Sequence, residues 1–302
     1  MKKNRSKLQK AIQTPGRALM NIIYHFPKFS AKLDDEKYVR FIYKWCFKKK
    51  LDLENPKTFS EKLQWIKLYD HNELYTRVVD KYAVKEYIAS QIGEEYIIPT
   101  IGLWSNFDEI DFEKLPQSFV LKCTHDSGGL VICKDKSNLD IKKARKKIVK
   151  SLNSNFFLLG REWPYKGVKP QIIAEPYISD SNGELNDYKF FCFNGQPKML
   201  FIASDRGIDT RFDFFDMDFN HLPFEQGHPN STKVLKKPDG FDHMKEIAMK
   251  LSEGFPEVRV DFYNVDGKIY FGELTLFHFS GFVPFEPEEW DEKMGSWIVL
   301  PS

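Results

Sequence analysis

The stretch Val258–Gly281, VRVDFYNVDGKIYFGELTLFHFSG, decides the fold class of this chain. β-Branched and aromatic residues fill it on both sides of a turn-forming sequence at 264–267. Such runs are typical of strands, and the Asn, Asp and Gly between them are typical of a turn. The stretch therefore predicts two strands, 258–263 and 268–274, that pair as a hairpin.

Four polar side chains of this hairpin are expected to converge. Side chains alternate between the faces of a strand, so Arg259 and Asp261 share one face of the first strand. Glu273 and Thr275 share one face of the second strand for the same reason. Mg²⁺ binds oxygen ligands and commonly takes one or two carboxylates, leaving its other positions to water and substrate phosphates. The hairpin therefore indicates a nucleotide site, although a solvated ion pair explains the same residues when the hairpin is taken alone.

The composition is that of an ordinary soluble globular protein. The 302 residues are 42% hydrophobic and 15% aromatic, enough to bury the core of one large domain or of two or three interlocked lobes. No apolar run reaches the roughly 18 residues of a membrane-spanning helix, and the basic start lacks the apolar core of a signal peptide. We therefore expect a cytoplasmic protein. The cysteines form no C-x-x-C pair, which indicates reduced core thiols rather than a zinc site or disulfides.

The net charge of +2 hides a strong asymmetry. Residues 1–50 hold 14 Lys and Arg against 3 Asp and Glu, whereas residues 51–302 hold 31 against 40. The basic start predicts contact with an anionic membrane surface, an acidic polysaccharide or nucleic acid, or else a solvated extension. Nucleic acid is disfavoured because no recognised binding motif accompanies the charge.

The first third of the chain is predicted to be helical. Residues 1–33 contain helix-compatible segments interrupted by Pro15-Gly16 and Pro27, with partial disorder expected at the extreme start. Apolar residues at three- and four-residue spacing predict a helix over 34–49. The stripe expected to pack inward consists of Tyr38, Phe41, Ile42, Trp45 and Cys46.

Two further helices follow in the sequence. A capping box opens residues 58–69 and predicts a helix there. A second helix is predicted over 74–91, with Gly93 as its C-terminal cap. It carries Lys81 and Lys85, which are solvated lysines unless a phosphate lies nearby.

A small-residue loop, THDSGG at 124–129, lies between two predicted strands, 118–123 and 130–133. Glycines permit close backbone approach, so successive amides of such a loop can cradle a phosphate. Lys122 ends the preceding strand, where its ammonium could reach the same phosphate. The remaining predicted elements are a basic helix over 139–153, a buried strand over 171–175, two strands around the turn Asn194-Gly195, and a helix over 241–253.

Several separated motifs, taken in chain order, resemble the ATP-grasp superfamily. More closely, ENPKTFSEKLQWIKLYD, DKYAVKEYIASQIGEEYIIPTIGLW, LPQSFVLKCTHDSGG and YFGELT are similar to the TupA-like ATP-grasp family, named for a teichuronopeptide-synthesis protein and found in surface polysaccharide loci. The resemblance covers about residues 34–302. It implies an α+β fold in which two α+β lobes grip a nucleotide behind an N-terminal helical extension. The implied division is 1–70 basic extension, 71–117 helix and linker, 118–180 small lobe with the glycine loop, and 181–302 C-terminal lobe with the metal site.

The resemblance also implies roles for particular residues. Three lysines would reach the nucleotide, Lys81, Lys85 and Lys122, and the loop over its phosphates would contain Ser127, Gly128 and Gly129. The hinge that contacts adenine would consist of Glu175, Pro176, Tyr177 and Ile178, and Asp187 would lie near the ribose. The metal ligands would be Asp261, Glu273 and Thr275, with two Mg²⁺ ions expected. Thr275 departs from the E-x-N pattern of many relatives. The catalytic cations would be Arg259, Lys189, Arg206 and Arg211, and His278 and Ser280 would contact substrate.

The implied reaction is ATP-dependent ligation of a carboxylate to an amine through an acyl-phosphate. The partners would be ATP, a carboxylate-bearing saccharide such as a uronic acid of a surface polysaccharide precursor, and an amine or amino acid. The basic start would contact the membrane or other polysaccharide-synthesis proteins. Two alternatives stay open: a glycosyltransferase, for which Asp216-Met217-Asp218 supplies a D-x-D pattern, and a non-catalytic polysaccharide-binding module.

Overall fold

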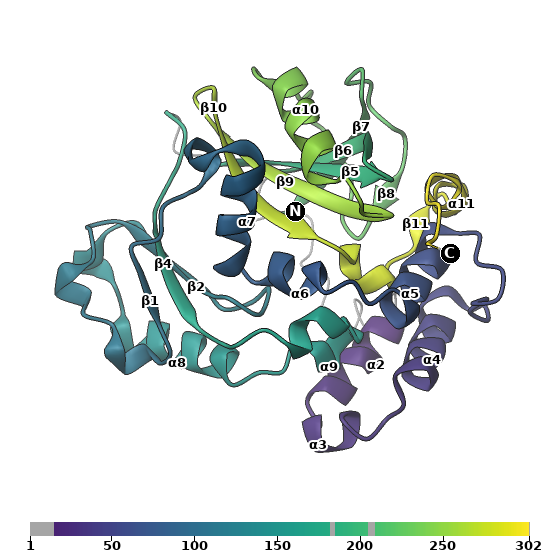
Figure 1. The fold of residues 1–302 in the computed structure, drawn as a ribbon, viewed down its shortest axis with the longest axis horizontal. Helices are drawn as coiled ribbons and strands as arrows, with labels where there is room; N and C mark the ends of the chain where they lie inside the picture. Colours follow the sequence, from purple (N-terminus) through teal and green to yellow (C-terminus); the bar gives the residue numbers. More distant parts are fainter. Residues whose placement is uncertain (1–14, 182–184, 205–208, 302) are drawn as a thin grey trace.

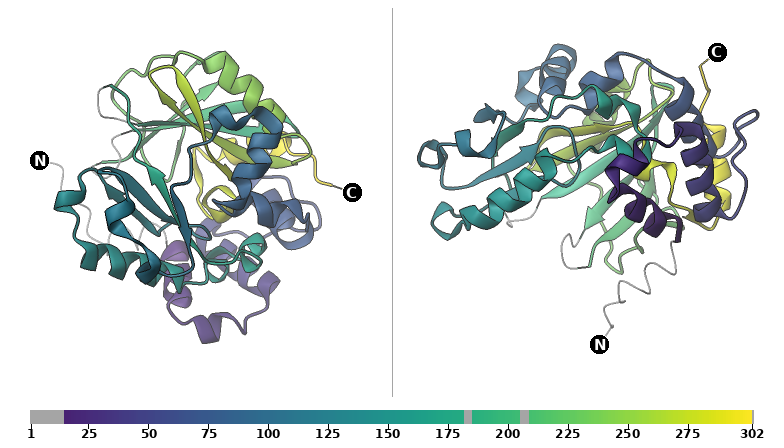
Figure 2. Two further views of the ribbon diagram at one scale, coloured as in Figure 1. Left: turned by 60° about the vertical axis from the view of Figure 1, so that its left-hand side comes forward. Right: turned by 90° about the horizontal axis from the view of Figure 1, so that it is seen from below.

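The chain folds as an α+β protein around two antiparallel sheets, seen in the computed structural model of Figure 1. The structure describes residues 15–181, 185–204 and 209–301. The four-stranded sheet and α8 (Ile141–Leu152) lie on one side of the molecule, and the N-terminal helices lie on the other (Figures 1 and 2). None of the helices in the described part of the chain is long and apolar enough to cross a membrane.

The smaller sheet and α8 form the small lobe. Its strand order is β1-β4-β2-β3, with every neighbouring pair antiparallel. Buried and half-buried residues alternate along Phe119–Cys123, so one face of the sheet packs against α8. The helix contributes Ala144 and Ile148 to the shared core. The strands are β1 (Gly102–Trp104), β2 (Phe119–Cys123), β3 (Leu130–Cys133) and β4 (Ile172–Pro176).

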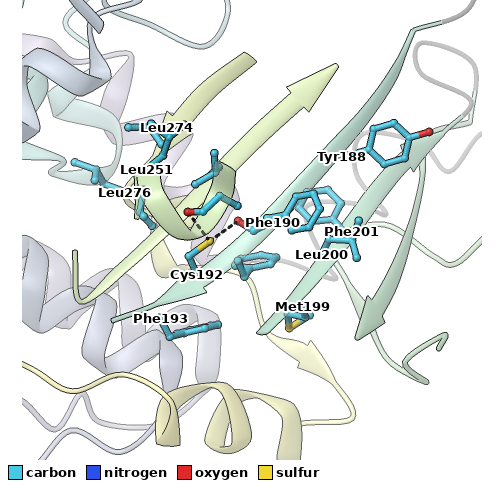
Figure 3. Packing of buried hydrophobic residues seen from close by; sticks show 14 of the residues in the cluster. Tyr188, Phe190, Cys192, Phe193, Met199, Leu200, Phe201, Leu251, Leu274 and Leu276 are labelled. Carbon is cyan, nitrogen blue, oxygen red and sulfur yellow. Dashed lines mark hydrogen bonds between the residues drawn. The ribbon is translucent and has the colours of Figure 1, made fainter. Parts of the chain in front are cut away.

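The larger sheet forms the large lobe, with strand order β10-β9-β5-β6-β7. One face is covered by α10 (Phe241–Leu251), and Figure 3 shows Cys192 of the sheet bonded to backbone carbonyls of Phe190 and Ala248 within this apolar core. The other face carries Lys189 and Asp261, paired across neighbouring strands. The strands are β5 (Asn186–Phe193), β6 (Gln196–Ser204), β7 (Arg211–Asp216), β9 (Glu257–Val265) and β10 (Lys268–Thr275).

Helix α5 (Phe59–Tyr69) joins the N-terminal part of the chain to the large lobe. Its capping box is present: Thr58 accepts from the Glu61 amide at 3.1 Å while Glu61 accepts from the Thr58 amide, which confirms the predicted start. Phe59 packs edge-on against Phe191 of the larger sheet. The other helices here are α2 (Pro15–Tyr24), α3 (Pro27–Ser30) and α4 (Asp35–Phe47).

The predicted interruption at Pro27 is confirmed: α2 ends at Tyr24, and Pro27 opens α3, where a proline at the first helical position loses no hydrogen bond. The disorder predicted for the extreme start concerns residues 1–14, which lie outside the described residues. The remaining elements are α9 (Phe157–Gly160), the two-stranded pair β8 (Glu225–Gln226) and β11 (Phe285–Glu286), and α11 (Glu289–Ser296).

The single helix predicted over 74–91 is wrong. The structure has α6 (Leu74–Val79) and α7 (Ala83–Ile92), which ends at the predicted cap Gly93. Asp80 breaks the helix because its carboxylate accepts from the amides of residues 82 and 83, at 2.8 and 3.1 Å. Lys81 therefore lies in the break, and its amide donates to Thr124 O of the small lobe at 3.1 Å.

Two details of other elements also differ from the prediction. On α4, Phe41 and Trp45 are 47% and 49% exposed, whereas Val39 and Tyr43 are buried. The reason is that α2 packs on the side of α4 that carries Val39 and Tyr43. In the hairpin, β9 and β10 extend to a two-residue turn at Asp266-Gly267, where both residues have positive φ, as a tight hairpin turn requires.

Candidate active site

The hairpin β9–β10 brings the four predicted side chains together. In its antiparallel register, Arg259 lies opposite Thr275, and Asp261 lies opposite Glu273. A β-bulge at Gly272 sets this register, and a Cβ added there would lie 3.0 Å from Asp261 O. The predicted sharing of faces is confirmed.

Arg259 is the centre of the cluster. Its Nε donates to Asp261 Oδ1 at 2.7 Å and its Nη2 to Asp261 Oδ2 at 2.8 Å, a two-pronged bond that suits the planar guanidinium. Nη2 also lies 3.1 Å from Glu273 Oε1 and 2.9 Å from Thr275 Oγ1. One guanidinium therefore orients both carboxylates and the hydroxyl.

Lys189 adds a second cation from β5. It lies opposite Asp261 in the sheet, and its Nζ donates to Asp261 Oδ2. The same Nζ lies 3.9 Å from Asp187 Oδ2. Lys189, Asp187 and Asp261 are all buried, so the two strands hold them in one arrangement.

Glu273 is the most accessible carboxylate of the cluster, with its side chain 46% exposed. Partial burial raises its pKa, but the positive charges of Lys189, Arg259 and Lys81 outweigh burial and lower it to about 2. Lys81 belongs to the break between α6 and α7, so its charge reaches Glu273 from another part of the chain. Glu273 is therefore ionised at neutral pH.

His278 holds the far side of Arg259. Its Nδ1 lies 2.6 Å from Arg259 Nη1, and its Nε2 lies 3.1 Å from Gln226 Oε1. Burial lowers the pKa of His278 well below its usual range, and the charges of Arg259 and Lys189 lower it further. The ring is thus neutral: Nδ1 accepts from the guanidinium and Nε2–H donates to Gln226.

The donor set of this cluster fits Mg²⁺ by type, since it offers only carboxylate and hydroxyl oxygens. Both oxygens of Asp261 accept from Arg259, whereas Glu273 is half-exposed and its bonds from Arg259 and Thr275 go to Oε1, which makes Glu273 Oε2 the more available ligand. Groups of three or more His, Cys, Asp or Glu that could hold a metal ion are absent from the described residues. The cluster therefore suits an ion that completes its shell with water and phosphates.

Glu175 of β4 collects two of the predicted phosphate lysines. Lys85 Nζ lies 2.6 Å from Glu175 Oε1, and Lys122 Nζ bonds Oε2. Burial raises the pKa of Glu175, but the two lysines outweigh it and lower the pKa. Lys85 also donates to Ile98 O at 2.7 Å and Thr100 Oγ1 at 2.9 Å, so it ties α7 to the small lobe.

Lys81 reaches the glycine loop instead. Its Nζ donates to Asp126 O, and burial lowers its pKa while Glu273 and Asp126 oppose that shift. Lys81 thus connects the loop of the small lobe with the carboxylates of the large lobe. Its charge therefore interacts with Asp126 of the loop and with Glu273 of the hairpin.

The loop residues have different environments. Ser127 and Gly128 are exposed, whereas Gly129 is buried and its amide donates to both oxygens of Asp126, at 3.1 and 2.9 Å. A Cβ at Gly129 would lie 2.3 Å from Ser151 Oγ, so packing requires this glycine. Ser127 and Gly128 are the part of the loop that faces solvent.

The hinge and the two additional arginines complete the predicted set. The hinge residues 175–178 continue from β4, where Glu175 is buried and the next three are half-buried. Arg211 begins edge strand β7 opposite Ser204, on the face of the sheet away from Lys189, and donates to Asn230 O at 3.2 Å. The structure does not bring it to the cluster. Arg206 lies outside the described residues.

Sequence reasoning missed several polar residues beside the cluster. Gln64 and Lys67 of α5 are buried, as is Glu162 in the segment after α9. Tyr165 lies near Glu162, Glu273 and Arg259, all of which act on its hydroxyl electrostatically. Periodicity within a segment could not find these residues, because their burial depends on contacts with distant parts of the chain, such as the bonds from Gln64 and Lys67 to Ser280 O.

The chain has low sequence identity to the solved structures that it resembles. No curated protein matches the chain. Among solved structures, D-alanine–D-alanine ligase from Helicobacter pylori is 15% identical, with TM-score 0.41, over 80% of this chain and 69% of that one. D-cycloserine synthetase DcsG is 15% identical, with TM-score 0.41, over 88% and 89% of the two chains. The ATP-grasp ligase PsnB, complexed with minimal precursor, Mg and ADP, is 11% identical, with TM-score 0.37, over 72% and 57%.

The family model of TupA-like ATP-grasp proteins matches residues 61–299, most of the chain. The matched range includes both sheets, the glycine loop and the hairpin that carries Arg259. The chain belongs to the TupA-like ATP-grasp family.

Proposed function

We propose that the protein joins a carboxylate to an amine through an acyl-phosphate made from ATP. The observation that carries the proposal is the Arg259 cluster: one guanidinium bonded to Asp261, Glu273 and Thr275, with Lys189 beside it. Oxygen ligands for a cation and fixed cations for phosphate occur together there, and phosphoryl transfer depends mainly on such positioning and charge.

In the first step, an oxygen of the substrate carboxylate attacks the γ-phosphorus of ATP and ADP leaves. Lys81 and Lys122, with the exposed amides at 127–128, are proposed to hold the phosphates. The hinge 175–178 is proposed to contact adenine, and Asp187 to lie near the ribose. Lys85 is the less available lysine because three oxygens already surround it.

Mg²⁺, proposed as two ions, would be held by Glu273, Thr275 and Asp261, and when bound it supplies charge that neutralises the phosphates. In the second step, an amine attacks the acyl carbon and phosphate leaves. Arg259 is proposed to stabilise the tetrahedral oxyanion and the departing phosphate. His278 keeps the guanidinium in place by accepting a bond from its Nη1.

The proposed substrates are a uronic acid of a surface polysaccharide precursor and an amino acid. Incubating the purified chain with ATP, Mg²⁺ and a panel of such pairs should release ADP, and mass spectrometry of the product should show an amide. Absence of ADP release with every pair, together with absence of ATP binding, contradicts the proposal. In a functional complementation assay, Glu273→Ala should abolish the function of a ligase, whereas a non-catalytic binding module would tolerate the change.

Glycosyl transfer is less well supported. The D-x-D pattern lies at the end of β7, where Asp216 accepts from the amides of Asp218 and Asn220 at 3.0 and 2.8 Å. Its carboxylate therefore closes a turn. Hydrolysis of a UDP-sugar without ATP would favour the transferase instead.

We further propose that the N-terminal helices touch the inner face of the membrane. The described residues 15–50 hold nine Lys and Arg against three Asp and Glu. Exposed apolar side chains accompany them: Ile22, Phe26, Phe29, Phe41 and Trp45. Vesicles containing phosphatidylglycerol should bind the chain more tightly than phosphatidylcholine vesicles, and Phe26→Ser should weaken that binding while Val234→Ser, at an exposed site outside these helices, should not.

A further inference from the structure

A buried polar cluster lies beside Arg259 and takes no part in the proposed binding of ATP. It consists of Lys67, Glu162 and Ser280, which are 1%, 7% and 8% exposed. Ser280 Oγ donates to Glu162 Oε1, and Lys67 Nζ donates to Ser280 O at 2.7 Å. A buried carboxylate and a buried ammonium held around one serine are costly to fold, which points to a functional reason for them.

The chain holds Ser280 in a strained conformation. Phe279, Ser280 and Gly281 have φ of 50°, 56° and 65°, in the left-handed region that residues other than glycine rarely adopt. Gln64 Nε2 fixes this turn by donating to Ser280 O at 3.0 Å and Gly281 O at 2.9 Å. Strain of this kind persists only where the surroundings over-determine it, and it concentrates at functional sites.

The cluster adjoins the part of the site where the acyl group would react. His278, two residues before Ser280, accepts the 2.6 Å bond from Arg259. Tyr165, three residues after Glu162, is half-buried, and the charges of Glu162 and Glu273 reinforce the effect of burial and raise its pKa. Glu162, Glu273 and Arg259 therefore all lie close enough to Tyr165 to act on its hydroxyl.

An amine substrate needs a proton acceptor at this place. At neutral pH an amine is mostly an ammonium ion, and it must lose a proton before its lone pair can attack the acyl carbon. We propose that Glu162, held by Ser280, binds this ammonium and accepts its proton, which makes Glu162 the catalytic base of the amide-forming step. This inference rests on the proposed function.

Glu162 takes one proton from the ammonium, and the nitrogen lone pair forms the bond to the acyl carbon. The bond from that carbon to the phosphate oxygen breaks, and phosphate leaves with the electron pair. The second proton lost by nitrogen leaves with the phosphate as hydrogen phosphate, and the amide keeps the third.

The charged and titratable groups that face Glu162 agree with this role. They are Lys67 from α5, Tyr165 from its own segment and Ser280 from the strained turn. Burial raises the pKa of Glu162, while Lys67 and the Ser280 bond oppose that shift. Burial likewise lowers the pKa of Lys67 to about 7. A carboxylate with a raised pKa is a stronger base than an exposed one.

The test compares two nucleophiles in the full chain. Hydroxylamine is largely uncharged at neutral pH and needs no base, so it traps an acyl-phosphate as a hydroxamate. Glu162→Gln keeps the oxygen that accepts from Ser280 but cannot take a proton. The amide-forming rate of Glu162→Gln is measured with the uronic acid and amino acid that release ADP fastest, and we expect it to fall about 10²–10⁴-fold. The rate at which this variant forms hydroxamate from the same uronic acid should fall less than about tenfold.

Equal losses with both nucleophiles, or an amide-forming rate within about threefold of wild type, overturn the role of Glu162. A wild-type chain that forms no hydroxamate and releases no ADP overturns the proposed function itself, so the two failures are distinguishable. Glu253→Gln, at an exposed glutamate of the large lobe, is the matched control. If Glu162→Gln does not fold, Glu162→Asp must show the same selective loss.

Discussion

Lys85 and Lys122 bond the same carboxylate, Glu175, yet the structure predicts different effects of removing them. Lys85→Met loses two bonds to neutral oxygens, at about 1 kcal/mol each, and a charge-assisted bond to buried Glu175 worth about 1.5–3 kcal/mol. The free energy of unfolding should therefore fall by about 3–5 kcal/mol. Lys122→Met loses only its charge-assisted bond to Glu175, so its free energy of unfolding should fall by about 1.5–3 kcal/mol, less than that of Lys85→Met.

ATP affinity should show the opposite order. Lys122 has one partner and is free to exchange it for a phosphate, so Lys122→Met should lose about 1.5–3 kcal/mol of binding, or about 10–100-fold in Kd. Isothermal titration with a non-hydrolysable ATP analogue measures Kd, and calorimetry should show Tm lower by about 5–15 °C in Lys85→Met. The reasoning is refuted if Lys85→Met weakens ATP binding as much as Lys122→Met while its Tm stays at the wild-type value.

Three other substitutions test separate parts of the structure. Arg259→Lys keeps the charge but loses the two-pronged bond to Asp261, so we expect kcat for amide formation to fall about 10²–10³-fold. A steady-state rate of ADP release within about threefold of the wild-type rate contradicts this expectation. Burial raises the pKa of Asp291 from 3.8 to about 6, so the folded chain keeps a proton there that the unfolded chain has lost, and stability falls as pH rises between these values. Asp291→Asn should thus be more stable than wild type by about 1–3 kcal/mol at pH 7 and equal to it near pH 3, as urea unfolding at both pH values can check. Gly129→Ala should cost about 1–3 kcal/mol, because its Cβ would lie 2.3 Å from Ser151 Oγ; an unchanged urea midpoint would show that the loop can shift.

Local patterns in the sequence predicted most elements because the forces that form them act over a few residues. The capping box of α5 was confirmed in both of its hydrogen bonds. The hairpin β9–β10 was confirmed in the faces that its polar side chains share, because alternation along a strand is a property of the backbone. The family was also identifiable from sequence, since its motifs occur in order along the chain.

Local patterns failed where a distant segment decided the outcome. The break at Asp80 depends on side-chain capping together with the bond from the Lys81 amide to Thr124 O, and the latter forms only after the small lobe has folded. Exposure of Phe41 and Trp45 depends on which side of α4 meets α2, and periodicity alone admits either side.

The sequence by itself determined the family, the α+β class and the convergence of Arg259, Asp261, Glu273 and Thr275, because these residues lie on one hairpin with a fixed alternation. Only the tertiary structure decided the cluster around Ser280. Its bond to Glu162 spans 118 residues and its bond to Lys67 spans 213. Contacts between segments that lie so far apart in the sequence depend on how whole elements pack together. The spacing of residues within one segment therefore does not predict them.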